Sequence, residues 1–153
     1  MKYRGTRDSF SSGGFITKCS GVTNTLTIIK STSGNIFGGF AEKAWISSGQ
    51  WVQDPKAYIF SIVNKDNKPF KADSNNNAAI ASSTSYGPVF GCDGKGRDIF
   101  IASDSNTNQT SACNFGGAFK HTDYEFGTEK AKTLLAGSYY FQTAEIEVFS
   151  ASN

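Results

Sequence analysis

The chain has 153 residues, a length that fits one domain with a hydrophobic core of its own. A net charge of +2 gives no field strong enough to indicate a nucleic-acid partner, and no apolar run reaches the roughly 18 residues that a membrane helix needs. The apolar residues are mostly β-branched or aromatic, with 13 Phe among them, which favours strands and excludes a helical bundle or coiled coil.

The first predicted element is a short helix over residues 11–21, which Ser11 caps and Gly21 ends. Strands are predicted at 26–30 and 36–41, joined by a hairpin turn at 33–35. A third strand, at 57–63, is almost continuously apolar and is therefore expected to be buried on both faces.

Residues 64–77 are polar and are predicted to form a surface loop. Strands at 88–92 and 98–102 flank a hairpin turn at Asp93-Gly94. Further strands are expected at 137–142 and 144–149. In the last of these, Glu145 and Glu147 alternate with apolar residues, which predicts one wet and one buried face.

These elements predict a mainly β protein, a two-sheet antiparallel β-sandwich with a few short helices. Six apolar side chains, spread over the predicted strands, are expected to point into one core between the sheets: Ile28, Ile36, Phe60, Phe100, Ile146 and Val148.

No constellation of residues in the sequence indicates catalysis or a metal site. The lone histidine, His121, has Asp123 and Cys113 near it at spacings that are not diagnostic of a triad. Three cysteines without a CxxC pair predict free thiols without metal in a cytoplasmic protein, and no cofactor is expected. A glycan-binding platform of Trp45 and Trp51 stays open as an alternative.

Several segments, read in order, resemble the TLDc domain, the module of the oxidation-resistance proteins. The most specific are IFGGF at 36–40, SYGPVFG at 85–91 and EIEVF at 145–149. The resemblance runs from about Tyr3 to Phe149, predicts a single TLDc-like domain over residues 3–150, and is closest to the protist and fungal branch.

The resemblance implies a two-sheet sandwich without enzymatic activity. It also implies a protein partner and a role in protection against oxidative damage, since several members bind and regulate the vacuolar proton pump (V-ATPase). No nucleic-acid partner and no membrane insertion are expected. Members usually carry an additional N-terminal segment, so part of the domain or a preceding module is expected to be missing. They often have glycine where this chain has Ser9.

Four polar residues stand at family-like positions: Asp8, Asp98, Ser138 and Glu145. We expect strand ends and loops to gather them at one edge of the sandwich, where they either bind backbone N–H groups or recognise a partner. Two functions from other classes stay open. One is a hydrolase that uses Glu145 or Asp98, and the other is a glycan-binding module.

Overall fold

Short strands rich in β-branched and aromatic residues form the sheets of the molecule. A computed structural model describes residues 1–74, 78–92 and 96–151. The strands are β1 (Tyr3–Arg4), β2 (Thr25–Ser31), β3 (Ile36–Ala41), β4 (Tyr58–Val63), β5 (Phe70–Asp73), β6 (Ile80–Ser83), β7 (Tyr86–Cys92), β8 (Arg97–Ala102), β9 (Ser111–Cys113), β10 (Tyr140–Phe141) and β11 (Thr143–Ser150). The helices are α1 (Gly5–Asp8), α2 (Ser12–Cys19) and α3 (Glu129–Leu134).

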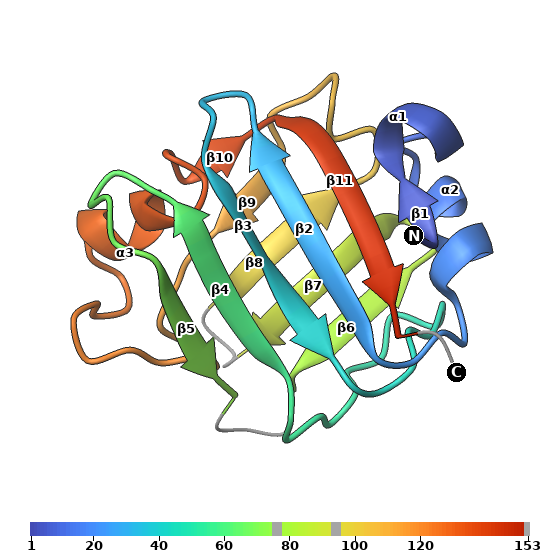
Figure 1. The fold of residues 1–153 in the computed structure, drawn as a ribbon, viewed down its shortest axis with the longest axis horizontal. Helices are drawn as coiled ribbons and strands as arrows, with labels where there is room; N and C mark the ends of the chain where they lie inside the picture. Colours follow the sequence, from blue (N-terminus) through green and yellow to red (C-terminus); the bar gives the residue numbers. More distant parts are fainter. Residues whose placement is uncertain (75–77, 93–95, 152–153) are drawn as a thin grey trace.

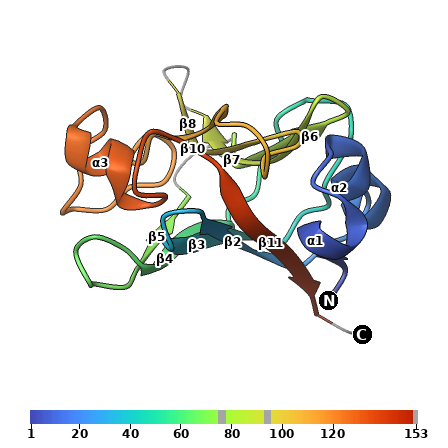
Figure 2. The same cartoon turned by 90° about the horizontal axis from the view of Figure 1, so that it is seen from above.

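The strands form two antiparallel sheets that lie face to face (Figure 1). One has six strands in the order β1-β11-β2-β3-β4-β5, and the other has five in the order β10-β9-β8-β7-β6. Figure 2 shows the two layers edge-on, with α1 and α2 at one end and α3 at the other. The predicted fold class is therefore confirmed.

The core between the sheets contains the inward-facing residues of both. In the six-stranded sheet these include Ile29, Phe37 and Ile59, and in the five-stranded sheet they include Phe90 and Ile99. A chain of edge-to-face aromatic contacts runs through one end of this core. Its ring-centroid distances are 5.6 Å from Tyr3 to Phe15, 5.4 Å from Phe15 to Trp45 and 5.5 Å from Trp45 to Phe90. It joins β1 and α2 to the opposite sheet.

Several predicted elements are confirmed. The first helix begins as expected, because the Ser11 side chain accepts a hydrogen bond from the Gly14 backbone N–H. The strands β2 and β3 form the predicted hairpin, and β11 turns Ile146 and Val148 inward while Glu145 and Glu147 face outward. The strands β7 and β8 pair as predicted, whereas the turn at Asp93-Gly94 lies outside the described residues.

The predicted core is wrong for four of its six members: Ile28, Ile36, Phe60 and Phe100 are only half-buried. Their neighbours Ile29, Phe37, Ile59 and Ile99 take the inward positions instead. Successive strand residues point to opposite faces, so a shift of one residue exchanges the two sets. Both sets are apolar here, and the sequence pattern therefore does not decide which set faces the core.

Two other expectations about β4 and its neighbourhood are also corrected. The strand β4 is not buried on both faces, because Ile62 is 51% exposed and Val63 is 44% exposed at its end. The segment at 64–77, predicted as loop, contains the edge strand β5, which pairs with β4. A strand of four residues with Lys71 and Asp73 outward is too polar for periodicity to identify.

The face assignment predicts different costs for two adjacent isoleucines. Ile29 is fully buried between the sheets, so Ile29→Ala should lower the free energy of unfolding by roughly 2–5 kcal/mol, measured by chemical denaturation. Ile28 lies on the outward side, and Ile28→Ala should cost less than half as much. Equal losses would contradict the assignment of the two faces.

Candidate functional site

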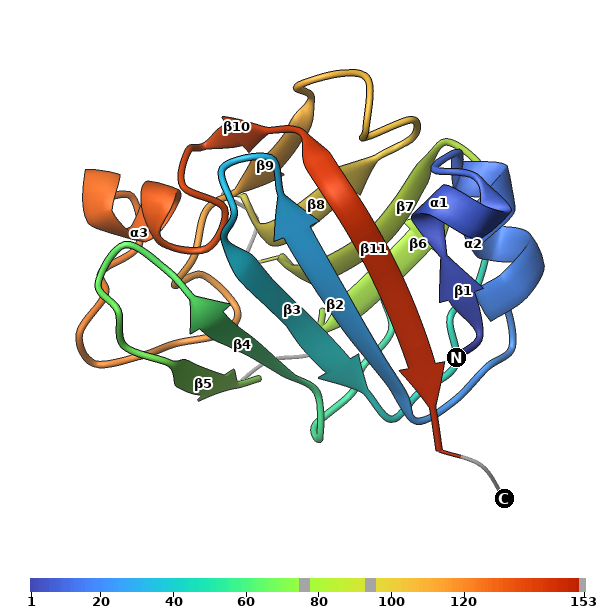
Figure 3. The same cartoon turned by 45° about the horizontal axis from the view of Figure 1, so that its top comes forward.

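A group of charged and hydroxyl side chains gathers where the N-terminal segment pairs with β11. Figure 3 shows β1 beside β11, with α1 and α2 next to it. The chain turns from β1 directly into α1 at Gly5. A Cβ there would lie 2.5 Å from the Phe10 ring, so the close approach of this ring favours glycine. We call this group the charged corner: Arg4, Thr6, Arg7, Asp8, Lys18, Glu145 and Glu147.

Glu145 ties α1 to β11. Its carboxylate accepts hydrogen bonds from the Thr6 backbone N–H (3.1 Å), the Thr6 hydroxyl (2.5 Å) and the Ile146 backbone N–H (3.0 Å). Arg4 Nε lies 3.6 Å from the same carboxylate, and Arg4 Nη2 lies 2.6 Å from Glu147 Oε1. Most of the acceptor positions of Glu145 are therefore used within the molecule.

Asp8 holds the other side of the charged corner. Its carboxylate accepts hydrogen bonds from the Arg4 backbone N–H (2.9 Å) and from the Arg7 guanidinium (2.6 Å and 2.9 Å), and Lys18 Nζ lies 3.9 Å away. Its side chain is only 8% exposed. The hydrogen bonds from Arg7, with smaller contributions from the Arg4 N–H and Lys18, lower the pKa of this carboxyl to about 2.

Ser9 follows Asp8 in a strained backbone conformation, with φ 86° and ψ 140°. This region is close to one that glycine alone occupies readily. Three contacts hold it there: the Ser9 N–H donates to the Gly5 carbonyl, the Ser9 carbonyl accepts from the Tyr3 hydroxyl at 2.9 Å, and the Ser9 hydroxyl accepts from the Ser11 N–H. The strain lies beside the charged corner.

The other two polar residues of the predicted group lie on the five-stranded side. Asp98, in β8, is fully buried and accepts hydrogen bonds from the backbone N–H groups of Gly116, Ala118 and Phe119. Ser138 is exposed in the turn before β10, where its hydroxyl donates to the Tyr140 carbonyl. The structure brings Asp8 and Glu145 together and places Asp98 and Ser138 elsewhere.

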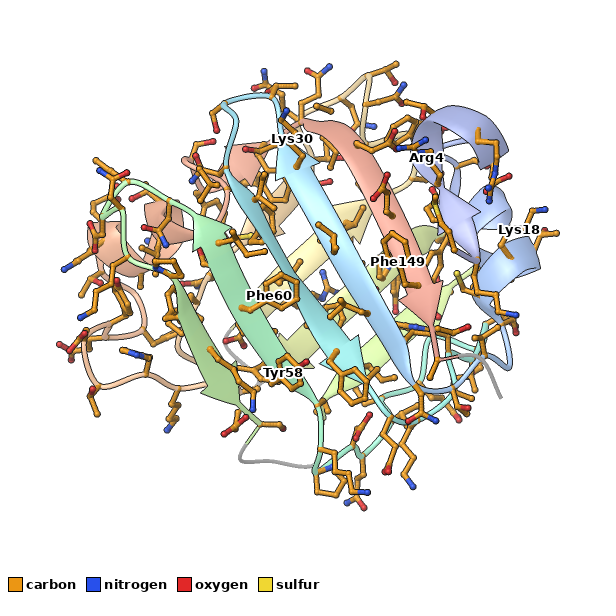
Figure 4. All side chains as sticks on the ribbon, viewed as in Figure 1. Arg4, Lys18, Lys30, Tyr58, Phe60 and Phe149 are labelled. Atoms are coloured by element: carbon orange, nitrogen blue, oxygen red, sulfur yellow. The ribbon has the colours of Figure 1, made fainter. Side chains whose placement is uncertain are left out.

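Sequence reasoning missed a second feature, the outward side of the six-stranded sheet. No helix or strand of the described residues covers it (Figure 4). We call this surface the outer face, and its apolar members are Leu26, Ile28, Ile36, Phe40, Tyr58, Phe60, Ile62 and Phe149.

Aromatic contacts order the outer face. The rings of Phe40 and Tyr58 stack with centroids 5.2 Å apart, and Lys71 Nζ lies 4.3 Å from the centre of the Tyr58 ring. The Phe60 ring lies over Gly38, where an added Cβ would be 3.0 Å from it. Covering a strand glycine with an aromatic ring protects the backbone that the glycine would leave exposed.

The outer face and the charged corner are continuous. A shallow depression of about 190 Å³ joins them, lined by Ile28, Lys30, Ile36, Glu145 and Glu147. Figure 4 shows Lys30 near the end of β2, Arg4 at the edge of the sheet, and Phe60 and Phe149 on its surface. Apolar side chains with charges at the margin are the usual anatomy of a protein-binding surface. Apolar residues on both sides of β2, β3 and β4 are the sequence signal that could have revealed this surface.

Two other candidate residues, Trp45 and His121, pack against side chains of the protein itself. Trp45 is fully buried and donates a hydrogen bond from Nε1 to the Thr25 hydroxyl, so a glycan platform built on both tryptophans is excluded. His121 packs against the rings of Phe70 and Tyr124, with centroid distances of 5.2 Å and 5.4 Å.

Two of the three cysteines are inaccessible thiols. Burial raises the pKa of the Cys19 thiol to about 12 and, with Asp98 nearby, raises that of Cys113 well above its ordinary value. Neither forms a disulfide. The reactive form of cysteine is the thiolate, so both are poor nucleophiles.

The model of the TLDc domain matches residues 1–152, which is almost the whole chain. The chain belongs to the TLDc family. TLDc domains are protein-interaction domains of the oxidation-resistance type. A search of curated proteins finds no match. No helix within the described residues of this TLDc domain is long and apolar enough to cross a membrane.

The depressed pKa of Asp8 predicts a pH dependence of stability. Its carboxyl has a pKa of about 2 in the folded protein and about 3.9 in the unfolded chain. Its contribution is therefore complete above about pH 4 and is lost as the pH falls through 2. Between about pH 4 and pH 2, the free energy of unfolding of Asp8→Asn should therefore fall less than that of the wild type, as measured by urea unfolding. Equally steep acid dependence in both proteins would contradict the ion pair.

The conformation of Ser9 predicts opposite effects of two small substitutions. Ser9→Gly relieves the strain, whereas Ser9→Ala keeps it and also loses the hydrogen bond to the Ser11 N–H. We expect the glycine variant to be more stable than the alanine variant by about 1–2 kcal/mol, after allowance for the larger entropy of unfolded glycine. Denaturant melts of the pair measure this difference, and equal stabilities would show that Ser9 is unstrained.

Proposed function

We propose that this TLDc domain is a non-enzymatic binding module that contacts the vacuolar proton pump and regulates it. The observation that carries the proposal is the apolar outer face joined to the charged corner. Exposed apolar patches of this kind, bordered by charged groups, mark protein-binding sites. Charges at the margin steer and orient a partner, while the apolar centre supplies most of the affinity.

The burial of two thiols bears on how such a protein protects against oxidative damage. Scavenging of oxidants needs an accessible thiolate, and the raised pKa values of Cys19 and Cys113 oppose its formation. We propose that protection does not depend on Cys19 or Cys113 and follows from regulation of the pump. Thiols without a disulfide at both positions fit the reducing cytoplasm, where we propose that the domain acts.

A hydrolase that uses Glu145 or Asp98 has less support. A general acid or base must lie within hydrogen-bond reach of the substrate. Asp98 is fully buried against backbone N–H groups, where a substrate does not reach it. Glu145 already accepts hydrogen bonds from Thr6. These contacts favour structural roles for both carboxylates and leave recognition to the surface around them.

The proposal predicts that capture of purified V-ATPase by the immobilised domain depends on the outer face. Ile62 is exposed at its margin, so Ile62→Ser should leave the unfolding midpoint nearly unchanged. Loss of a buried apolar contact in the complex should weaken capture about tenfold. The fraction of pump retained on the resin at increasing domain density measures the effect.

A matched control lies away from the outer face. Trp51 is 36% exposed in the segment that borders β6, and Trp51→Ser removes an apolar side chain without touching the six-stranded sheet. It should be captured as the wild type is. Equal capture of Ile62→Ser and wild type would remove the outer face from the interface, and no capture of the pump by the wild type would overturn the choice of partner.

A further inference from the structure

The five-stranded sheet carries a pocket that the proposed function does not use. Its volume is about 380 Å³, within the range of small-molecule sites. Strands β8, β9 and β10 line it through Phe100, Ala112 and Tyr140, and the residues before β9 and β10, Thr110 and Tyr139, complete the wall. The residues of the outer face belong to the other sheet, so the two surfaces are independent.

The register of three strands explains the hollow. Ala112 of β9 pairs with Tyr140 of β10 on one side and with Phe100 of β8 on the other. Two aromatic side chains therefore stand on either side of a methyl group, about 9–10 Å apart by the usual strand spacing. Tyr140 is 60% exposed, and its ring meets that of Tyr139 edge to face at 4.6 Å. The space above Ala112 is bounded by aromatic rings and is open to solvent.

A cation is held in place at the edge of this space. The guanidinium carbon of Arg97 lies 4.6 Å from the centre of the Phe100 ring and 5.9 Å from that of Tyr86. It forms no ion pair with a described residue. Lys132 adds a second positive charge, with Nζ 5.8 Å from the Tyr139 ring centre. No carboxylate is among the described residues that line the pocket.

We propose that this pocket binds a small flat aromatic molecule that carries a carboxylate or phosphate group. The space above Ala112 accepts the ring, which contacts Phe100 and Tyr140. The guanidinium N–H groups of Arg97 can donate hydrogen bonds to the anionic group. A guanidinium commonly binds two oxygens of a carboxylate or phosphate at once. The stacked position of Arg97 on Phe100 orients it in advance, which lowers the entropy lost on binding.

The test is an NMR titration of the full chain with four probes that separate the two halves of the ligand. Phenyl phosphate and benzoate carry both the ring and the anion, benzyl alcohol carries the ring, and inorganic phosphate carries the anion. We expect the ring anions to shift the backbone amide signals of Phe100, Ala112 and Tyr140 saturably, with Kd in the millimolar range, and the two halves to bind at least about tenfold more weakly. Absence of saturable shifts at these residues with either ring anion would overturn the proposal.

Three variants distinguish the pocket from general attraction to a positive surface. Arg97→Gln should weaken phenyl phosphate binding at least about tenfold while leaving the weak binding of benzyl alcohol unchanged. Ala112→Leu fills the hollow but keeps the cation, and it should abolish binding of both ring anions. Lys71→Gln removes a positive charge from the other sheet and should bind as the wild type does. Unchanged binding in either pocket variant, at wild-type signal dispersion, would contradict the site.

Discussion

Asp98 accepts hydrogen bonds from three backbone N–H groups at a position from which water is excluded. Removal of the carboxylate would leave these three N–H groups buried without an acceptor, and each unsatisfied donor would lower the free energy of unfolding. One of the three belongs to Phe119, whose ring packs against Phe90. Phe90 is in turn the end of the aromatic chain that leads through Trp45 to Phe15 and α2. A single carboxylate thus fixes the end of a contact path that crosses the sandwich to the N-terminal helices.

That path explains why a site forms at the N-terminal end. The segment α1 is a single turn, too short to be stable alone. It is held by Tyr3 in the core on one side and by Glu145 on β11 on the other. The backbone of the charged corner is consequently held to the core and to β11 by contacts on both sides. It borders an apolar sheet face whose side chains are already ordered, so a partner would meet two prearranged surfaces.

The sequence predicted the fold well wherever polar and apolar residues alternate strictly, as in β11, where Glu145 and Ile146 were assigned to the correct faces. It did not resolve β2, β3 and β4, because Ile28 and Ile29 are equally apolar and only the paired sheet decides which one faces inward. Binding of backbone N–H groups by Asp98 was one of two roles that the sequence suggested, but the donors themselves were out of reach, since they lie 18 to 21 residues later in an irregular segment. Ser9 was noticed only as a departure from the family pattern, and its backbone angles give that departure a physical meaning.

The positions of the two tryptophans make their intrinsic fluorescence informative about two different parts of the molecule. Trp45 is sealed among aromatic rings between the layers, whereas Trp51 is in contact with solvent. Their fluorescence therefore differs in colour and in access to a dissolved quencher. The buried indole of Trp45 reports on the packing between the sheets, and the exposed indole of Trp51 reports on the segment beside β6. A change in the interior can accordingly be distinguished from a change in the segment beside β6 with the unlabelled chain.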